Sequence, residues 1–484
     1  MIITQITPIK IASTIGSPKD LPVLYVDSSK QGIPILKINS LDYPRRVVYS
    51  QKFRLKIEVL YSLNRTTNIM IHVYEHAGPL LNWTEDSLYG NGIKTYELTI
   101  VAPSKEKPQW QLNIHLFYRD GEEWIQSDIE SVYIQVSKEM EYDIIYVDDS
   151  NANDPNEDGS PEHPFDKIQE AVDAAKDGDT IFVRSGTYYE TVVIDKSVSL
   201  IGEDLRTTII DGCERGSVVY IIADNITLTD FTIRNSAESI FYDYAGIKLY
   251  SSSGNRIIRN KIEDCGYGVY LEKSSNNSIE CNTIIAYGGD IGIYLISNSS
   301  RNLIENNSIV AGGGIFLPNA GIVLYSSNNT VRKNLINGFR DGICNSYQNY
   351  IYGNILKRNL INGIYNLDAI NSIIAWNLIE ESEVGIQLNC CFNCTITYNI
   401  IRKCKQSGWT GYSYTRGIYL HSARNSTIAK NLVEGSTYGI YFDQSSNNLV
   451  IENDVGRFTY NEFSVYLFWS SGNEFYHNNF LSLH

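Results

Sequence analysis

The sequence lacks long apolar runs, an excess of basic residues and methionine. No stretch reaches the roughly 18–20 apolar residues that a bilayer-spanning helix needs, so we expect no membrane span. Among 484 residues, 40 Lys and Arg stand against 55 Asp and Glu, a formal net charge of −15. This charge argues against a nucleic-acid partner, because such proteins present a basic face. With only three Met, the chain also has few soft ligands for copper.

The first five residues show no basic region followed by an apolar core, which is the pattern of a signal peptide. We nevertheless expect a secreted or cell-surface glycoprotein, because the acceptor sequence Asn-x-Ser/Thr recurs along the chain. These sequons begin at Asn64, Asn82, Asn225, Asn276, Asn298, Asn306, Asn328, Asn393 and Asn425.

The eight cysteines are few for 484 residues, and most lie in the second half of the chain. Four of them are close in sequence, Cys390, Cys391, Cys394 and Cys404, but their spacing matches no recognised zinc finger. Buried apolar cysteines, or disulfide bonds outside a reducing cytosol, are the two interpretations that we favour. The sequence does not give a disulfide pairing.

The dominant feature of the sequence is a repeat of about 22 residues, a period typical of a solenoid. Its first half is Gly-Ile-x-Leu, and its second half is Asn-x-Ile-x-x-Asn-x-Ile. The first half begins at Gly246, Gly268, Gly292, Gly321, Gly342, Gly363, Gly385, Gly417 and Gly439, with a degenerate copy at Ser464. The second half gives the pairs Asn255/Asn260, Asn277/Asn282, Asn302/Asn307, Asn329/Asn334, Asn349/Asn354, Asn448/Asn453 and Asn473/Asn478.

Each apolar patch of the repeat is short, alternates with polar residues and is bounded by Gly, Asn or Ser. This alternation predicts short β-strands separated by turns, with neighbouring coils stacked about 4.8 Å apart. One coil cannot bury its apolar side alone, so the stack makes one continuous core. We expect the Asn residues to adopt the left-handed conformation at the turns and to hydrogen-bond along the stack.

The repeat resembles the pectin-lyase-like superfamily of right-handed parallel β-helix proteins, in its NosD-like branch. The resemblance covers residue 145 to the end and implies a ligand groove along the Gly-Ile-x-Leu strands. The superfamily includes polysaccharide lyases and hydrolases, uronate epimerases, phage tailspikes and non-catalytic surface proteins. The Asp-Pro-His-Asp motif of the uronate epimerases is absent from this sequence.

Two domains are expected. Residues 1–140 contain alternating strands such as Phe53 to Val59, which predict an immunoglobulin-like β-sandwich that acts as a spacer or contacts a glycan. Residues 141–484 form the β-helix. Its single helix, expected over 165–176 from the spacing of Ile168, Ala171, Val172 and Ala175, covers the open first coil.

An acidic loop lies between residues 148 and 158. Its oxygen-bearing side chains at alternate positions suit Ca²⁺. The predicted ligands are Asp149, Asn151, Asp154 and Asp158, although the order does not match an EF-hand. A solvated polar loop without a metal is the alternative interpretation.

The residue x of Gly-Ile-x-Leu points outward, because side chains alternate along a strand. It is Tyr in several coils, and Tyr suits stacking on sugar rings, although it is also an ordinary strand residue. An insertion between Arg402 and Arg416 is expected to overhang the same face. The predicted substrate-binding residues are Tyr270, Tyr294, Tyr365, Tyr419, Tyr441 and Trp409.

The next outward position brings His421 and Asp443 together on adjacent coils, about 5 Å apart. With Arg416 nearby, this acid–base pair is what a polysaccharide lyase or epimerase needs. A hydrolase needs a second carboxylate, for which Asp341, Asp368 and Glu383 are candidates. A surface His–Asp contact without catalysis is the alternative.

Two functions follow. The first is an extracellular protein that binds a polysaccharide or cell-surface glycan and cleaves it as a lyase or glycoside hydrolase. The second is a non-catalytic surface or adhesion protein, glycosylated and assembled end to end through a last coil, Asn473 to Leu481, that has no cap.

Overall fold

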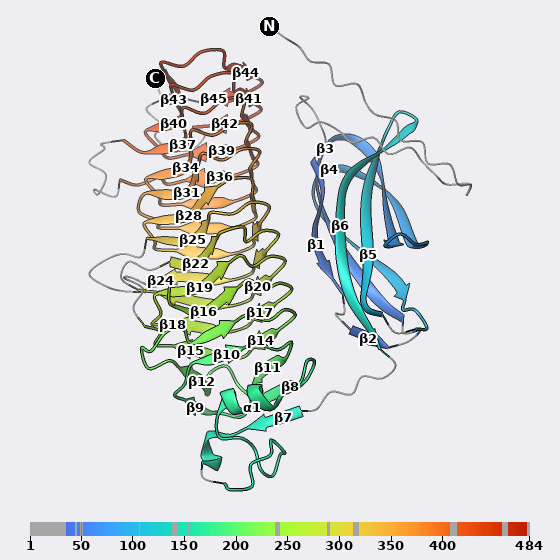
Figure 1. Cartoon of the computed structure of the whole chain (residues 1–484). Coiled ribbons are helices and arrows are strands. Elements are labelled where there is room, and N and C mark those ends of the chain that lie inside the picture. Colours follow the sequence, from blue (N-terminus) through green and yellow to red (C-terminus); the bar gives the residue numbers. More distant parts are fainter. Residues whose placement is uncertain are drawn as a thin grey trace. The chain divides into compact units, whose positions relative to one another are not determined.

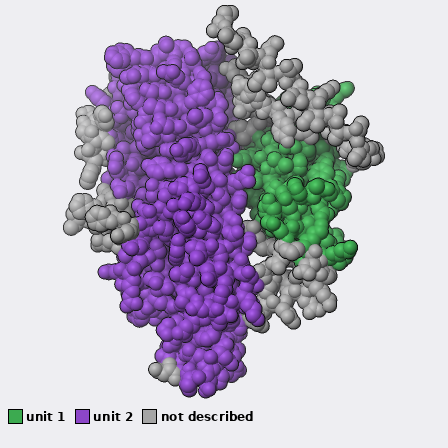
Figure 2. Space-filling view, viewed as in Figure 1, with its two compact units in different colours: residues 1–141 green, residues 142–484 purple. Residues whose placement is uncertain are grey.

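The computed structural model describes residues 35–43, 46–48, 50, 52–105, 107–137, 144–152, 154–237, 243–287, 291–312, 319–406, 414–456 and 463–481. The chain divides into two compact units, Met1–Glu141 and Tyr142–His484 (Figures 1 and 2). The predicted boundary between residues 140 and 141 falls outside the described residues. No helix among the described residues is both long and apolar enough to cross a membrane.

The first unit is one sheet of six strands. They are β1 (Ile35–Asp42), β2 (Arg46–Val48), β3 (Lys52–Glu75), β4 (Leu80–Val101), β5 (Lys107–Asp120) and β6 (Glu123–Ser137). One edge of β3 pairs with β4 along most of its length. The other edge of β3 pairs with β1 in its first half and with β5 in its second half. Leu55 and Ile57 from the first half and Ile71 and Val73 from the second half belong to one buried core. This enclosed, mainly antiparallel sheet is consistent with the predicted immunoglobulin-like sandwich.

The second unit is a parallel β-helix built from three long sheets, to which successive coils add one strand each (Figure 1). Sheet 1 has 12 strands. They are β10 (Val192–Ile194), β13 (Val219–Ile221), β16 (Ala245–Tyr250), β19 (Tyr267–Glu272), β22 (Ile291–Ile296), β25 (Ala320–Leu324), β28 (Asp341–Ser346), β31 (Asn362–Leu367), β34 (Val384–Asn389), β37 (Arg416–His421), β40 (Tyr438–Asp443) and β43 (Phe463–Phe468).

Sheet 2 has 14 strands. They are β7 (Ile144–Val147), β8 (Thr180–Val183), β11 (Ser199–Gly202), β14 (Thr227–Thr229), β17 (Arg256–Ile258), β20 (Ser278–Glu280), β23 (Leu303–Glu305), β26 (Thr330–Arg332), β29 (Tyr350–Tyr352), β32 (Ile373–Ala375), β35 (Thr395–Thr397), β38 (Thr427–Ala429), β41 (Leu449–Ile451) and β44 (Glu474–Tyr476).

Sheet 3 has 13 strands. They are β9 (Gly186–Tyr188), β12 (Thr208–Asp211), β15 (Thr232–Arg234), β18 (Lys261–Glu263), β21 (Thr283–Ala286), β24 (Ser308–Ala311), β27 (Leu335–Asn337), β30 (Ile355–Lys357), β33 (Leu378–Glu380), β36 (Ile400–Arg402), β39 (Leu432–Glu434), β42 (Asp454–Val455) and β45 (Asn479–Phe480). The apolar residue of each short strand points inward, as the alternation predicts, and one core runs through the stack. The all-β parallel β-helix predicted from the repeat is therefore confirmed.

A helix lies at the start of the solenoid, beside β7, β8 and β10 (Figure 1). It is α1 (Ile168–Ala174), preceded by the short 3-10 helix η1 (Asp149–Asn151). Ile168, Ala171 and Val172 join the core, as predicted. The predicted range 165–176 is too long at both ends. Phe165 forms a β-bridge with Val147, and the extended backbone of Ala175 ends the helix.

Two buried ladders of hydrogen bonds run along the corners of the solenoid. In the longer one, the backbone N–H of each Asn donates to the side-chain oxygen of the Asn in the next coil, at 2.9–3.0 Å from Asn260 to Asn478. The predicted hydrogen bonding between stacked asparagines is therefore confirmed. The prediction that the ladder Asn itself adopts the left-handed conformation is wrong. The left-handed residue is the one before each ladder Asn, such as Arg259, Cys281 and Lys333, because the ladder side chain must point inward.

Candidate functional site

The candidate site is the outward face of β37, β40 and β43, near the C-terminal end of sheet 1 (Figure 1). Alternation turns Ile418 and Leu420 of β37 into the core and their neighbours outward. The parallel register then aligns the outward residues in three rows across the strands. The rows are Arg416–Tyr438–Phe463, Tyr419–Tyr441–Tyr466 and His421–Asp443–Phe468.

Asp443 and His421 lie directly opposite each other on neighbouring strands, as predicted. Nδ1 of His421 is 2.9 Å from Oδ2 of Asp443, and the phenol of Tyr419 donates a hydrogen bond to the same oxygen at 3.2 Å. The side chain of His421 is 35% exposed and that of Asp443 only 16%. Oδ1 of Asp443 is buried and has no hydrogen-bond partner among the described residues. The carboxylate is thus a fixed, half-buried acceptor, and the imidazole is the more accessible of the two groups.

Aromatic rings surround this pair. The rings of Tyr419 and Tyr441 are 5.2 Å apart and tilted by 47°, and those of Tyr441 and Tyr466 are also 5.2 Å apart and nearly parallel, at 7°. The guanidinium of Arg416 lies over Tyr419 at 4.7 Å and over Tyr441 at 5.2 Å. A guanidinium on aromatic faces is attracted by the ring electrons and held in one place. The site therefore combines a fixed cation, a row of stacked rings and the His–Asp pair.

The phenols of Tyr419 and Tyr441 remain neutral over the physiological pH range. Burial raises the pKa of Tyr419 above its usual value, and the negative charge of Asp443 raises it further, against the opposing effect of Arg416. Burial and Asp443 raise the pKa of Tyr441 in the same direction. Because a neutral phenol keeps its proton, Tyr419 acts as a hydrogen-bond donor to Asp443.

Three of the other predicted substrate-binding residues, Tyr270, Tyr294 and Tyr365, lie in earlier coils and not in this site. Tyr270 is fully buried, at 0% exposure, so the prediction that it offers a ring face to a sugar is wrong. The rings of Tyr267 and Tyr294 lie 5.3 and 5.5 Å from it, and the ammonium of Lys248 lies 4.8 Å above it. Tyr294 belongs to this separate cluster in earlier coils. Tyr365 accepts a hydrogen bond from Asn389, and Trp409 lies outside the described residues.

Among the outward positions of β37, β40 and β43, Asp443 is the only carboxylate. The carboxylates considered as hydrolase partners stand elsewhere. Asp341 is buried at the start of β28 and accepts hydrogen bonds from Asn362, and Glu383 is buried in the turn before β34. Asp368 occupies a left-handed turn after β31. The outward positions of β37, β40 and β43 thus supply one carboxylate and one imidazole, and not two facing carboxylates.

The predicted site residues leave out four aromatic residues of these rows, Tyr438, Phe463, Tyr466 and Phe468. Tyr438 and Phe463 stack at 5.3 Å in the row that Arg416 begins, and Phe468 stacks on the exposed Trp469 at 4.9 Å. The repeat pattern of the sequence could have identified them, because each stands at the same repeat position as a predicted site residue. Only the register of the strands shows that these positions form rows.

The predicted calcium ligands do not converge. Asp149 accepts from the backbone N–H of Thr187, and Asp158 accepts from that of Ser160. Asp154 binds His163 at 2.7 Å and the amide of Asn151 at 3.3 Å. Each carboxylate therefore already has a partner within the protein, and calcium binding by this loop stays a prediction. Among the described residues, one group of carboxylates does converge, within 4.8 Å, namely Glu157, Asp166 and Glu170.

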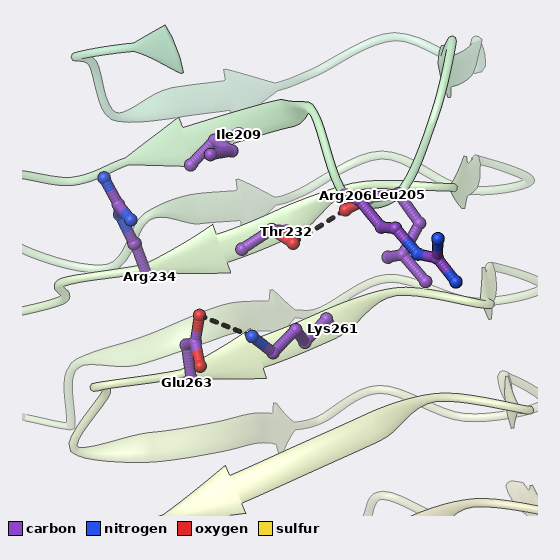
Figure 3. A pocket seen from close by; sticks show the side chains of 7 residues that line it. All are labelled: Leu205, Arg206, Ile209, Thr232, Arg234, Lys261 and Glu263. Carbon is purple, nitrogen blue, oxygen red and sulfur yellow. Dashed lines mark hydrogen bonds and ion pairs between the residues drawn. The ribbon is translucent and has the colours of Figure 1, made fainter. Parts of the chain in front are cut away.

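A hollow of about 400 Å³ lies on the outer face of sheet 3, over β12, β15 and β18 (Figure 3). None of the predicted site residues lines it. Its charged groups are largely paired, since Lys261 binds Glu263 at 2.9 Å and Arg234 binds Asp211 at 2.8 Å. Thr232 donates to the carbonyl oxygen of Leu205. Most of the polar groups that line the hollow thus already have a partner within the protein.

The solved structures similar to this chain include enzymes and an adhesin. The alginate lyase from Paenibacillus sp. str. FPU-7 is 16% identical over 64% of this chain and 96% of that chain, with a TM-score of 0.33. The DFA-IIIase from Arthrobacter chlorophenolicus A6 in complex with GF2 is 12% identical over 63% and 94%, with a TM-score of 0.48. PfbA, a surface adhesin of Streptococcus pneumoniae, is 14% identical over 64% and 86%, with a TM-score of 0.44. At these identities the likeness concerns the fold and not an activity.

No curated protein matches the chain by sequence. The family model described as "Right handed beta helix region" matches residues 202–356 and 317–455. Together these matches cover more than half of the 484 residues. The chain therefore belongs to the family of right-handed β-helix proteins.

Proposed function

We propose that this β-helix protein binds a polysaccharide across β37, β40 and β43 and cleaves it by acid–base chemistry. The observation that carries the proposal is the contact between His421 and Asp443, at 2.9 Å, beside the adjacent rings of Tyr419, Tyr441 and Tyr466. Tyrosine rings have an apolar face that suits the apolar face of a sugar, and the phenol bonds its hydroxyls. The three rows of outward residues extend over neighbouring strands, which suits a chain of sugars better than one small molecule.

Asp443 orients the imidazole in this proposal. With the N–H of Nδ1 donating to Asp443, Nε2 of His421 carries a lone pair and acts as the general base. A single base and a nearby cation favour a lyase over a hydrolase, which uses two carboxylates. Nε2 takes the proton from the carbon beside a uronate carboxyl group, whose charge Arg416 neutralises. The C–O bond to the leaving sugar then breaks, an unsaturated uronate forms, and the leaving oxygen receives the proton from the imidazolium.

The experiment is a panel of acidic and neutral polysaccharides, followed by reducing-end release and by the ultraviolet absorbance of unsaturated uronates. We expect the absorbance to rise with an acidic substrate. His421→Ala is expected to lower the rate at least about a hundredfold, because general base catalysis contributes factors of this order. Asp443→Asn is expected to lower kcat with little change in KM, since it leaves the ring rows intact.

The matched control is Asp264→Asn. Asp264 is exposed, stands in a left-handed turn that Asn also adopts, and lies in an early coil. Its replacement is expected to leave the rate unchanged. Release of reducing ends without ultraviolet absorbance would overturn the lyase and point to a hydrolase. Binding without cleavage of any substrate would reduce the proposal to a glycan-binding protein.

We also propose that the protein acts outside the cell or on its surface. The support is the position of the sequons in the solenoid. Asn276, Asn306 and Asn328 are exposed and stand in left-handed turns at the corners of the coils. A glycan attached at such a corner extends into solvent without disturbing a strand. Treatment of the protein from its natural source with an N-glycosidase is expected to lower its mass.

As a second candidate function, we propose that two copies of the chain associate through the coil of β43, β44 and β45. In the described part of the chain, each of these strands pairs on one side only. An unpaired strand edge is a template for another strand. The same coil exposes large apolar side chains, among them Phe463, Leu467, Tyr476, Phe480 and Trp469, the last at 79% exposure.

Sedimentation equilibrium tests this association. We expect the wild-type chain to dimerise with rising concentration and the double variant Leu467→Lys/Trp469→Ser to remain monomeric. Tyr189→Ser is the control, because Tyr189 is also a highly exposed aromatic residue but lies at the beginning of the solenoid. A wild-type chain that stays monomeric at all concentrations would remove this candidate.

A further inference from the structure

A buried unit of four residues recurs at the corner between sheets 1 and 2. In most coils it reads Ser-x-x-Asn, at Ser252/Asn255, Ser274/Asn277, Ser299/Asn302, Ser326/Asn329, Ser445/Asn448 and Ser470/Asn473. The two side chains of one unit meet inside the turn, as shown by the hydrogen bond of 3.1 Å that Asn255 Nδ2 donates to Ser252 Oγ. Each also belongs to a ladder. The backbone N–H of Ser252 donates to Ser274 Oγ, and that of Asn255 donates to Asn277 Oδ1.

One coil carries cysteine at both positions of this unit, in the sequence Cys391-Phe392-Asn393-Cys394. Both side chains are buried, at 1% exposure each. They take over the ladder contacts of serine and asparagine. Cys391 Sγ donates to the carbonyl oxygen of Asn366 at 3.1 Å, and Cys394 Sγ donates to that of Ala369 at 3.4 Å, as Ser299 and Asn277 do in their coils. The backbone N–H of Cys394 continues the ladder to Ser426 Oγ at 3.1 Å.

The two thiols therefore occupy the positions at which Ser252 and Asn255 are hydrogen-bonded to each other. The amide of Asn366 donates to both sulfurs, at 3.5 Å to Cys391 and 3.6 Å to Cys394. The hydrogen bond from Cys391 holds the pKa of Cys394 below its usual value, although burial opposes this effect. A thiolate at Cys394 is thus the more stable of the two, and the thiolate is the reactive form of cysteine.

We propose that Cys391 and Cys394 are a site of disulfide formation within a single turn of the solenoid. In this reaction, which takes place as the chain folds and before the turn is buried, the Cys394 thiolate attacks a sulfur of a small disulfide such as oxidised glutathione, and one glutathione thiolate leaves. The Cys391 sulfur then attacks the mixed disulfide, loses its proton and displaces the second glutathione. One sulfur–sulfur bond forms in the protein, the two cysteines are oxidised, and one glutathione disulfide is reduced to two thiols.

The position of this turn gives the bond a structural role. It follows β34 directly, and the backbone N–H of Cys390 donates to the carbonyl oxygen of His421 at 2.8 Å. A bond between Cys391 and Cys394 therefore ties the turn that supports the strand of the candidate site. The closed loop is short, so it constrains the unfolded chain little. The test therefore detects the disulfide bond itself and not a change in stability. Its result does not depend on the proposed polysaccharide activity.

The experiment counts thiols in the full chain. The variant Cys281→Ser/Cys390→Ser serves as background, because these are the two exposed cysteines. It is unfolded in urea, refolded in a mixture of oxidised and reduced glutathione, isolated as folded monomer, and then alkylated under denaturing conditions. We expect the loss of two thiols relative to a sample refolded with reductant. Peptide mapping is expected to place the bond between Cys391 and Cys394, and a reducing agent is expected to reverse it.

The matched control restores the repeat unit by adding Cys391→Ser and Cys394→Asn to the same background. This chain regains the serine and asparagine that other coils use, so it is expected to fold and to lose no thiols on oxidation. The proposal is overturned if the background variant keeps all its thiols after oxidative refolding. It is also overturned if mapping places the bond at any other cysteine.

Discussion

Replacing Asn334 by leucine is expected to lower the free energy of unfolding by about 5 kcal/mol, because the side chain makes five buried hydrogen bonds at about 1 kcal/mol each. Its oxygen accepts from the backbone N–H and the amide of Asn307, at 2.9 and 3.0 Å. Its amide donates to the carbonyl oxygens of Ile304 and Arg332 and to the side chain of Asn354. Leucine fills a similar volume but replaces none of these bonds. Urea unfolding followed by circular dichroism measures the change.

Asn337→Leu is the matched control. Asn337 lies in the same coil, at the end of β27, and is half-buried on the outer face. Within the described residues its side chain makes no hydrogen bond, so its replacement is expected to change stability by less than about 0.5 kcal/mol. If Asn334→Leu and Asn337→Leu unfolded at the same urea concentration, the ladder would not be a main source of stability.

The ladder also explains why the fold was predictable from the sequence. Each coil repeats the same local requirements, with inward Ile or Leu, a Gly at the start of the sheet 1 strand and an Asn at the corner. Because every coil meets its neighbour in the same register, one repeat unit specifies the whole stack. The prediction of the left-handed residue failed at a finer level. The periodicity locates the corner, but the backbone conformation of Arg259 and Asn260 depends on which side chain turns inward.

The candidate site was predictable only in part. His421 and Asp443 were predicted because they occupy the same repeat position in adjacent coils. The register between two adjacent strands depends only on those two repeats, so the sequence specifies it. Burial is not local. Tyr270 and Tyr419 stand at the same repeat position, yet Tyr270 is fully buried and Tyr419 is not. Tyr267 and Lys248 lie against Tyr270, whereas the same two repeat positions beside Tyr419 hold Arg416 and Gln387.

Gly385→Ala is expected to destabilise the solenoid by about 3 kcal/mol, because there is no space for a methyl group. A Cβ at this position would lie 2.4 Å from Cγ2 of Ile401 and 2.6 Å from the backbone oxygen of Gly417. A side chain can rotate away, but the backbone of Gly417 is held in sheet 1 by the pairing of β34 with β37. Thermal unfolding measures the loss. Gly216→Ala is the control, because the nearest atom, in Tyr244, lies at 3.8 Å, an ordinary contact.

The same substitution also tests whether the geometry of β37 governs ligand binding. Gly417 follows Arg416 in that strand, so a methyl group at Gly385 presses on the backbone that positions the candidate site. Gly268→Ala produces an equivalent clash, 2.4 Å from the backbone oxygen of Gly292, in an early coil. Both variants are expected to lose similar stability, while only Gly385→Ala weakens polysaccharide binding well below its unfolding temperature. Equal binding by the two variants would show that the ligand binds elsewhere on the solenoid, because the distortion of β37 would then leave polysaccharide binding unchanged.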